Sequence, residues 1–137
     1  VNHGGSITTD DATITYVNAI HSSVLPDGSY GGNPGGFIIE AEDTTIYFAG
    51  DTARHKDMEL FGEEYDIDVA ILPIGGTFTM DAESAAKSLA MLDCEHAIGV
   101  HYDTFPPIEI DHEAAKTVFN NHDKQLTLLD PDTTTSL

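Results

Sequence analysis

The chain has 137 residues, 40% of them hydrophobic, which is enough for one domain around one core. It carries 24 acidic and five basic residues, and the formal net charge of −19 excludes a basic surface for nucleic acid. No apolar run could span a bilayer, the first residues lack a signal-peptide pattern, and the single cysteine excludes an internal disulfide. These features predict a cytoplasmic protein with neither a membrane nor a nucleic-acid partner.

The acidic residues are dispersed along the chain rather than gathered in a tail, and most of them are aspartate. One interpretation is a surface suited to high salt, where the repulsion between like charges is screened. The other is simply an acidic, soluble protein. Composition leaves both open.

The first half of the chain contains four strand-like segments, recognised by their β-branched and aromatic content: 13–20, 36–40, 45–48 and 68–74. In the first of them, Ile14, Tyr16 and Ile20 are predicted to share one face. The second and third form a hairpin around Glu42 and Asp43. The fourth is a nearly continuous apolar run, typical of a strand buried on both faces. A turn-rich loop covers 27–35, and a short helix is predicted around 58–61.

The second half repeats this alternation of helices and strands. Asp81 is predicted to cap a helix that runs through Leu92, and Asp111 is predicted to cap another. Strands are expected over 97–100 and 125–129. The sequence therefore predicts an α/β domain over 1–130, with one mixed sheet and helices on one side. Residues 131–137 are predicted to be a frayed tail.

Three side chains that can bind metal follow predicted strands directly: His21, Asp51 and His101. Separate strands can aim their ends at one point, and imidazole and carboxylate suit Zn²⁺, Mn²⁺ or Fe. The alternative interpretation is three independent polar residues at strand ends. In that case Asp51, which follows the small pair Ala49-Gly50, caps a turn or the next helix.

Four stretches of the sequence strengthen the interpretation as a metal site: "IHSS", "YFAGDT", "DIDVAILPIGGTFTM" and "HYDTFPPIEID". In this order they resemble the metallo-β-lactamase superfamily. The resemblance is closest to its branch of predicted metal-dependent hydrolases, which is related to the ascorbate-6-phosphate lactonases. It covers nearly the whole chain, and it implies one half of an αββα sandwich.

The resemblance also implies roles for individual residues. Asp51 matches the family's aspartate that bridges two metal ions, and it is the predicted catalytic residue. His21 matches a ligand of one of these two ions, and His101 matches a ligand of the other. The expected metal is zinc, with manganese and iron as alternatives. A water activated by the divalent metal then attacks an ester, lactone or phosphodiester. Thr52, Tyr102 and Thr104 flank these ligands, which makes them candidates to support the ligands or to contact substrate. Gly50 is expected to keep bulk away from the ions.

The chain also departs from the family. The first metal motif, His-x-His-x-Asp-His, appears nowhere, so the chain resembles only the C-terminal half of the family fold. Gly76 stands where an acid is expected, and Asp103 where an amide is expected. One hypothesis is a hydrolase completed in trans, by a homodimer partner or by a separate chain that carries the missing half. The other is a non-catalytic half-domain that binds metal or a partner without turnover.

The substrate-shaping loops are predicted at 22–35 and 77–80, and neither contains a basic residue that could hold a phosphate. Among the remaining histidines, His55 and His112 are expected to be solvated, and His122 to lie at a helix end. His96 close to Cys94 is a weak pattern for a metal site, because no second cysteine accompanies it.

Overall fold

Seven strands form one mixed sheet in the computed structural model, which describes residues 1–136. The strands lie side by side in chain order: β1 (Ser6–Thr8), β2 (Thr13–Asn18), β3 (Gly35–Ala41), β4 (Thr44–Phe48), β5 (Val69–Pro73), β6 (His96–Val100) and β7 (Gln125–Leu128). Neighbouring strands from β1 to β4 are antiparallel, and those from β4 to β7 are parallel.

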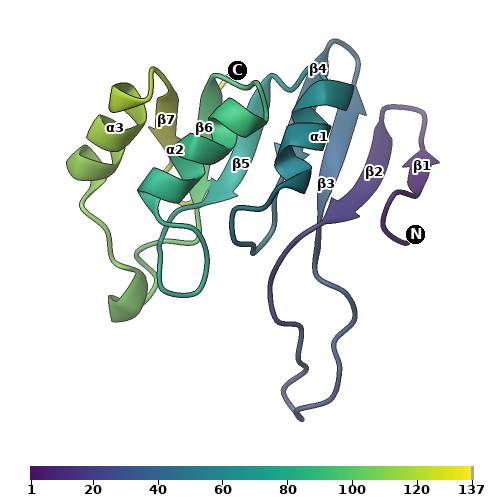
Figure 1. Ribbon diagram of the computed structural model, residues 1–137, viewed down its shortest axis with the longest axis horizontal. Coiled ribbons are helices and arrows are strands. Elements are labelled where there is room, and N and C mark those ends of the chain that lie inside the picture. Colours follow the sequence, from purple (N-terminus) through teal and green to yellow (C-terminus); the bar gives the residue numbers. More distant parts are fainter. Residues whose placement is uncertain (137) are drawn as a thin grey trace.

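Each parallel pair is joined by one helix, and the three helices lie on the same face of the sheet (Figure 1). They are α1 (Asp57–Glu64), α2 (Ala82–Met91) and α3 (His112–Asn121), and a short 3₁₀ turn, η1 (Pro106–Ile108), precedes α3. Crossovers between parallel strands have one preferred hand, so three crossovers that step in one direction place their helices on one side. The predicted α/β architecture with helices on one side is confirmed.

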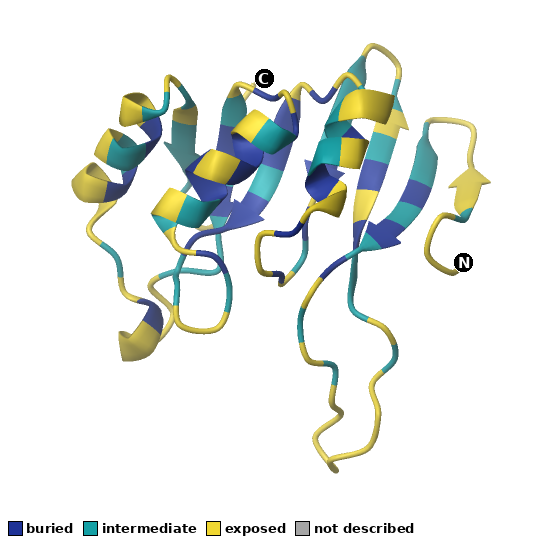
Figure 2. Cartoon of the chain, in the orientation of Figure 1, coloured by how far each residue is buried: buried dark blue, intermediate teal, exposed yellow. Residues whose placement is uncertain are grey.

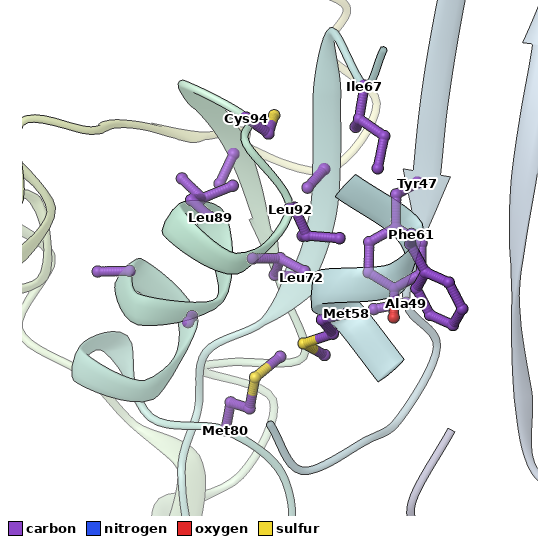
Figure 3. Packing of buried hydrophobic residues seen from close by; sticks show 14 of the residues in the cluster. Tyr47, Ala49, Met58, Phe61, Ile67, Leu72, Met80, Leu89, Leu92 and Cys94 are labelled. Carbon is purple, nitrogen blue, oxygen red and sulfur yellow. The ribbon is translucent and has the colours of Figure 1, made fainter. Parts of the chain in front are cut away.

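The main core lies between the sheet and these helices. Strand register aligns Ile38, Tyr47, Ala70 and Ala97 in one row across β3 to β6, and all four are fully buried. Figure 3 shows Tyr47 against Phe61 of α1, with ring centroids 5.7 Å apart. Small residues in the row leave room for the helices to approach, so the apolar face of each helix is buried on the sheet.

The opposite face of the sheet is also apolar, but none of the three helices lies on it (Figure 2). Register aligns a second row there: Tyr16, Phe37, Phe48, Ile71 and Ile98. The two phenylalanines are 37% and 38% exposed. We call this row and its neighbours the open face. The prediction that 68–74 is a strand buried on both faces is correct for most of the segment: Val69 and Pro73 are buried on the open face, Ala70, Leu72 and Ile74 are buried on the other, and Ile71 is half-buried.

The predicted elements are present, with differences at their ends. The strand predicted over 13–20 ends at Asn18, so Ile20 does not share a face with Ile14 and Tyr16. The amide of Ile20 donates to the side chain of Thr52 instead of to the sheet. β1 was not predicted, because its three residues are all exposed and carry no apolar pattern.

Both predicted helix caps are confirmed. The carboxylate of Asp81 accepts a hydrogen bond from the Ser84 amide at 2.8 Å, and that of Asp111 accepts from the Ala114 amide at 3.0 Å. The Ser84 bond is the main reason that the pKa of Asp81 lies below its usual value.

Residues 129–136 lie outside any helix or strand, and the last residue of the predicted tail 131–137 falls outside the described residues. In the part of the chain that the structure describes, no helix has the length and apolarity needed to cross a membrane.

Candidate functional site

An open pocket of about 680 Å³ lies at one edge of the sheet. The strand directions explain what gathers there: β2, β4, β5 and β6 run the same way, so their carboxyl ends share this edge. The loops that follow these four strands supply its lining: Ile20, His21, Ser22, Asp51, Ala53, Thr77, Phe78, Thr79, His101 and Phe105. All three residues predicted as metal ligands therefore lie in one pocket.

Asp51 and His101 face each other across the end of β5. The Oδ2 atom of Asp51 lies 3.6 Å from Nε2 of His101. This distance is too long for a hydrogen bond. Two ligands at the usual Zn–O and Zn–N lengths in a tetrahedral shell lie about 3.3 Å apart, which is close to the distance observed. The pair therefore fits two donors to one divalent metal.

Backbone geometry holds each member of this pair in place. Gly50 has a φ of +64°, and a Cβ on it would lie 2.8 Å from the carbonyl oxygen of Gly35, so a side chain is excluded just before Asp51. Gly75 lies against His101, where an added Cβ would meet the His101 carbonyl oxygen at 2.3 Å. His101 itself has a φ of +57°, a left-handed conformation that is uncommon for a residue other than glycine.

Asp51 does not cap the next helix. α1 begins at Asp57, with Lys56 in the N-cap position. Among the described residues the Asp51 carboxylate accepts no hydrogen bond from a backbone amide, and its side chain is 48% exposed in the pocket. The cap interpretation therefore has no contact to support it.

His21 has a defined tautomer. Its Nδ1 lies 2.8 Å from the carbonyl oxygen of Ser22, and because a carbonyl can only accept, Nδ1 carries the proton. The lone pair is then on Nε2, as a metal ligand requires. Within residues 1–136, however, no three His, Cys, Asp or Glu side chains are grouped to hold one metal ion. The role of His21 as a ligand stays a prediction.

Thr52 joins the loop of His21 to the loop of Asp51. Its Oγ1 accepts from the Ile20 amide at 2.9 Å and donates to the Ala53 carbonyl at 2.8 Å, while the Ala53 amide donates to the Ile20 carbonyl at 3.0 Å. Thr52 is fully buried. It is thus placed to fix the spacing of the two loops rather than to contact a substrate.

Tyr102 and Thr104, the other predicted supporting residues, lie in a neighbouring pocket of about 450 Å³ that shares only His101 with the first. The Tyr102 hydroxyl donates to the Leu129 carbonyl at 3.5 Å, and its ring meets the edge of His112. Burial raises the pKa of the Tyr102 hydroxyl. Neither residue lines the pocket of Asp51.

Asp103 contacts the start of α3. Its Oδ2 lies 2.5 Å from Nε2 of His112, and its Oδ1 accepts from the Ile110 amide at 2.9 Å. The His112 contact is the main reason that the pKa of Asp103 is lowered. The carboxylate that stands where an amide was expected therefore fastens the loop after His101.

His55 was predicted to be solvated, and this is wrong. It is buried against Phe61, and neither ring nitrogen has a hydrogen-bond partner in residues 1–136. Burial lowers the pKa of His55, against the opposing effect of Asp57, whose Oδ2 lies 3.9 Å away.

Cys94 and His96 do not form a metal pair. The thiol donates to the His96 carbonyl at 3.4 Å, while Nε2 of His96 bonds the Thr127 hydroxyl at 2.7 Å.

Three pocket residues were not predicted from the sequence: Ile20, Ala53 and Phe105, while Phe78 was included only as part of the predicted loop 77–80. Ile20 was assigned to a strand face. The two phenylalanines stand in loops beside turn residues, where a large aromatic side chain has no core to enter, and this was the signal available. Of the two predicted pocket loops, 77–80 contributes three residues and 22–35 contributes only Ser22.

Residues 1–101 match a family model described as the Beta-lactamase superfamily domain. Two curated relatives, each named UPF0173 metal-dependent hydrolase, come from Methylacidiphilum infernorum and Christiangramia forsetii. Each is 52% identical to this chain, over 94% and 95% of its length respectively. The aligned regions make up 57% and 58% of those relatives, so the chain spans little more than half their length.

Solved structures share the fold. A metallo hydrolase named Igni18 from Ignicoccus hospitalis superposes with a TM-score of 0.83 at 35% identity, covering 96% of this chain and 57% of that one. An isothiocyanate hydrolase from Delia radicum gut bacteria gives a TM-score of 0.77 at 19% identity, covering 96% of this chain and 57% of that one. At that identity the second likeness concerns the fold alone.

Proposed function

The chain belongs to the metallo-β-lactamase superfamily, and we propose that it supplies part of the active site of a metal-dependent hydrolase. The observation that carries this proposal is the 3.6 Å separation of Asp51 Oδ2 and His101 Nε2 in a pocket at the carboxyl ends of the strands. Relatives with 52% identity carry the name metal-dependent hydrolase, which agrees with this use of the pair.

In this proposal Asp51 and His101 hold a divalent metal, with His21 as a further ligand through Nε2. Zinc suits one carboxylate and two imidazoles, as do manganese and iron. When bound, the metal lowers the pKa of the attacking water and polarises the bond that is cleaved in an ester, lactone or phosphodiester.

The residues of the chain have separate tasks. The exposed carboxylate of Asp51 orients the water, because an oxygen that is not bound to metal can accept a hydrogen bond from it. His101 holds its ring against Asp51 from a fixed backbone conformation. Thr52 sets the distance between the loops of Asp51 and His21 through the bonds described above.

We propose that ligands from outside this chain complete the metal site. The chain lacks the His-x-His-x-Asp-His motif that the family resemblance associates with the first metal. The open face supports a partner, since an apolar face of this kind is normally covered in a folded protein. In a preparation of this chain alone, a second copy is the partner we expect, and a separate chain is the alternative.

Hydrolysis assays test the function directly. The protein is incubated with Zn²⁺ or Mn²⁺ and a panel of chromogenic esters, a lactone and a phosphodiester. Asp51→Ala and His101→Ala should each abolish the metal-dependent rate. Asp103→Asn is the matched control and should retain activity, because this side chain faces α3 rather than the pocket and asparagine keeps an oxygen that can accept from the Ile110 amide. Metal binding without any turnover would support the alternative, a non-catalytic metal-binding module.

A further inference from the structure

Two aromatic rings form one wall of the pocket. Phe78, in the loop after β5, and Phe105, in the loop after β6, stack with ring centroids 5.9 Å apart and an interplanar angle of 30°. They are 53% and 43% exposed. Single exposed hydrophobic residues are common on protein surfaces, but these two are paired and share a pocket with the Asp51–His101 pair.

The aromatic wall is held in place by its own loops. The hydroxyl of Thr77 donates to the Pro107 carbonyl at 2.8 Å, which ties the loop of Phe78 to the loop of Phe105. The Ile108 amide donates to the Phe105 carbonyl at 3.1 Å and closes the 3₁₀ turn. A ligand would therefore meet an aromatic surface that already has its shape, with little ordering cost on binding.

The charge of the lining favours a neutral ligand. Ile20 and Ala53 add apolar surface, and Thr79 adds a hydroxyl whose oxygen has no partner within residues 1–136. Among the residues that the structure describes, Asp51 is the one carboxylate in the lining, and no lysine or arginine lines the pocket. In the metal-free chain, a phosphodiester would place its negative charge near Asp51 on a protein of net charge −19, without a side-chain cation to offset it.

We propose that the pocket takes a neutral ester or lactone that carries an aromatic or other flat apolar group seated on Phe78 and Phe105. This rests on the proposed function and narrows it, because phosphodiesters are then poor substrates. In the reaction, water oxygen bonds to the acyl carbon and the C–O bond to the alcohol breaks. The leaving alkoxide takes one water proton, and the acid releases the other to solvent and becomes a carboxylate.

Binding can be measured without metal or turnover. The ¹⁵N-labelled chain is titrated with N-benzylacetamide, which is neutral and aromatic, and with benzyl phosphate, which has the same ring and a negative charge. N-benzylacetamide should shift the amides of residues 76–80 and 103–106 and bind at least tenfold more tightly than benzyl phosphate. Phe78→Ala and Phe105→Ala should each weaken its binding about three- to tenfold, as expected for the loss of one aromatic contact.

Phe37→Ala is the matched control, since this phenylalanine is similarly exposed but lies outside the pocket. The affinity of this variant for N-benzylacetamide should match that of the original chain. Phe78→Leu and Phe105→Leu keep apolar bulk and guard against loss of fold in the alanine variants. Equal or tighter binding of benzyl phosphate, or unchanged affinity in all four pocket variants, would overturn the proposal. Failure of the proposed function is seen separately, because metal titration needs no aromatic probe and the probe titration needs no metal.

Discussion

Replacing Thr52 with valine should loosen the metal site without altering any proposed ligand. Valine has nearly the shape of threonine, so the cavity stays filled, but it cannot accept the hydrogen bond from the Ile20 amide. The loop that carries His21 is then held to the loop of Asp51 only by the bond from the Ala53 amide to the Ile20 carbonyl. The two loops gain freedom to move apart.

The magnitude follows from this contact. Leaving the Ile20 amide unpaired in a partly buried place should cost about 1–3 kcal/mol of unfolding free energy. Thr52→Ser keeps the hydroxyl and removes one buried methyl group, which should cost about 1 kcal/mol. The two variants can thus have similar stability, whereas only valine breaks the link between the loops.

Metal affinity separates the two effects. Urea unfolding gives the stability of each variant, and competition with a chromophoric chelator gives its zinc affinity. If Thr52 positions the ligands, Thr52→Val should weaken zinc binding about 10- to 100-fold, and Thr52→Ser should stay within about twofold of the original. Equal zinc affinities in the two variants would refute the positioning role, whatever their stabilities.

Three further predictions concern the whole chain. Burial lowers the folded-state pKa of His55, so its contribution to stability should be lost as pH falls below about 6.5. His55→Phe should lose less stability than the original chain between pH 7.5 and 5.5 in urea melts, and an equal loss would contradict this. With a net charge of −19, thermal melts should shift upward toward molar salt, and a flat or falling series would exclude the high-salt interpretation. Light scattering at micromolar concentration should give a dimer that Phe48→Glu, on the open face, converts to monomer, whereas a monomeric original chain would refute pairing.

The sequence located the candidate ligands because strand ends are visible in it. β-Branched runs marked β2, β4 and β6, and a polar residue after each run had to emerge at a sheet edge. The alternation of strands and helices along the chain predicted a layered α/β domain with its helices on one side of the sheet, and the structure has this arrangement. The predicted helix caps Asp81 and Asp111 form as expected, since their bonds are local and depend on few residues.

Other features depend on contacts between distant segments and could not be read locally. His55 looked like a solvated residue at a helix start, yet the turn before α1 directs it against Phe61. Ile20 continued a strand pattern in the sequence, but its amide donates a hydrogen bond to the side chain of Thr52, 32 residues away, instead of to a neighbouring strand. The left-handed backbone at His101 leaves no sequence signal, because a residue other than glycine adopts it under tertiary constraint.

Zinc titration of the ¹⁵N-labelled chain, followed through its histidine ring nitrogens, tests most directly whether Asp51 and His101 form a metal site. Substoichiometric zinc should first shift Nε2 of His101 and then Nε2 of His21. The shifts should vanish in Asp51→Ala and persist in Asp103→Asn. If zinc first moves His112, or if Asp51→Ala leaves the His101 shift unchanged, the metal site does not lie at this pair.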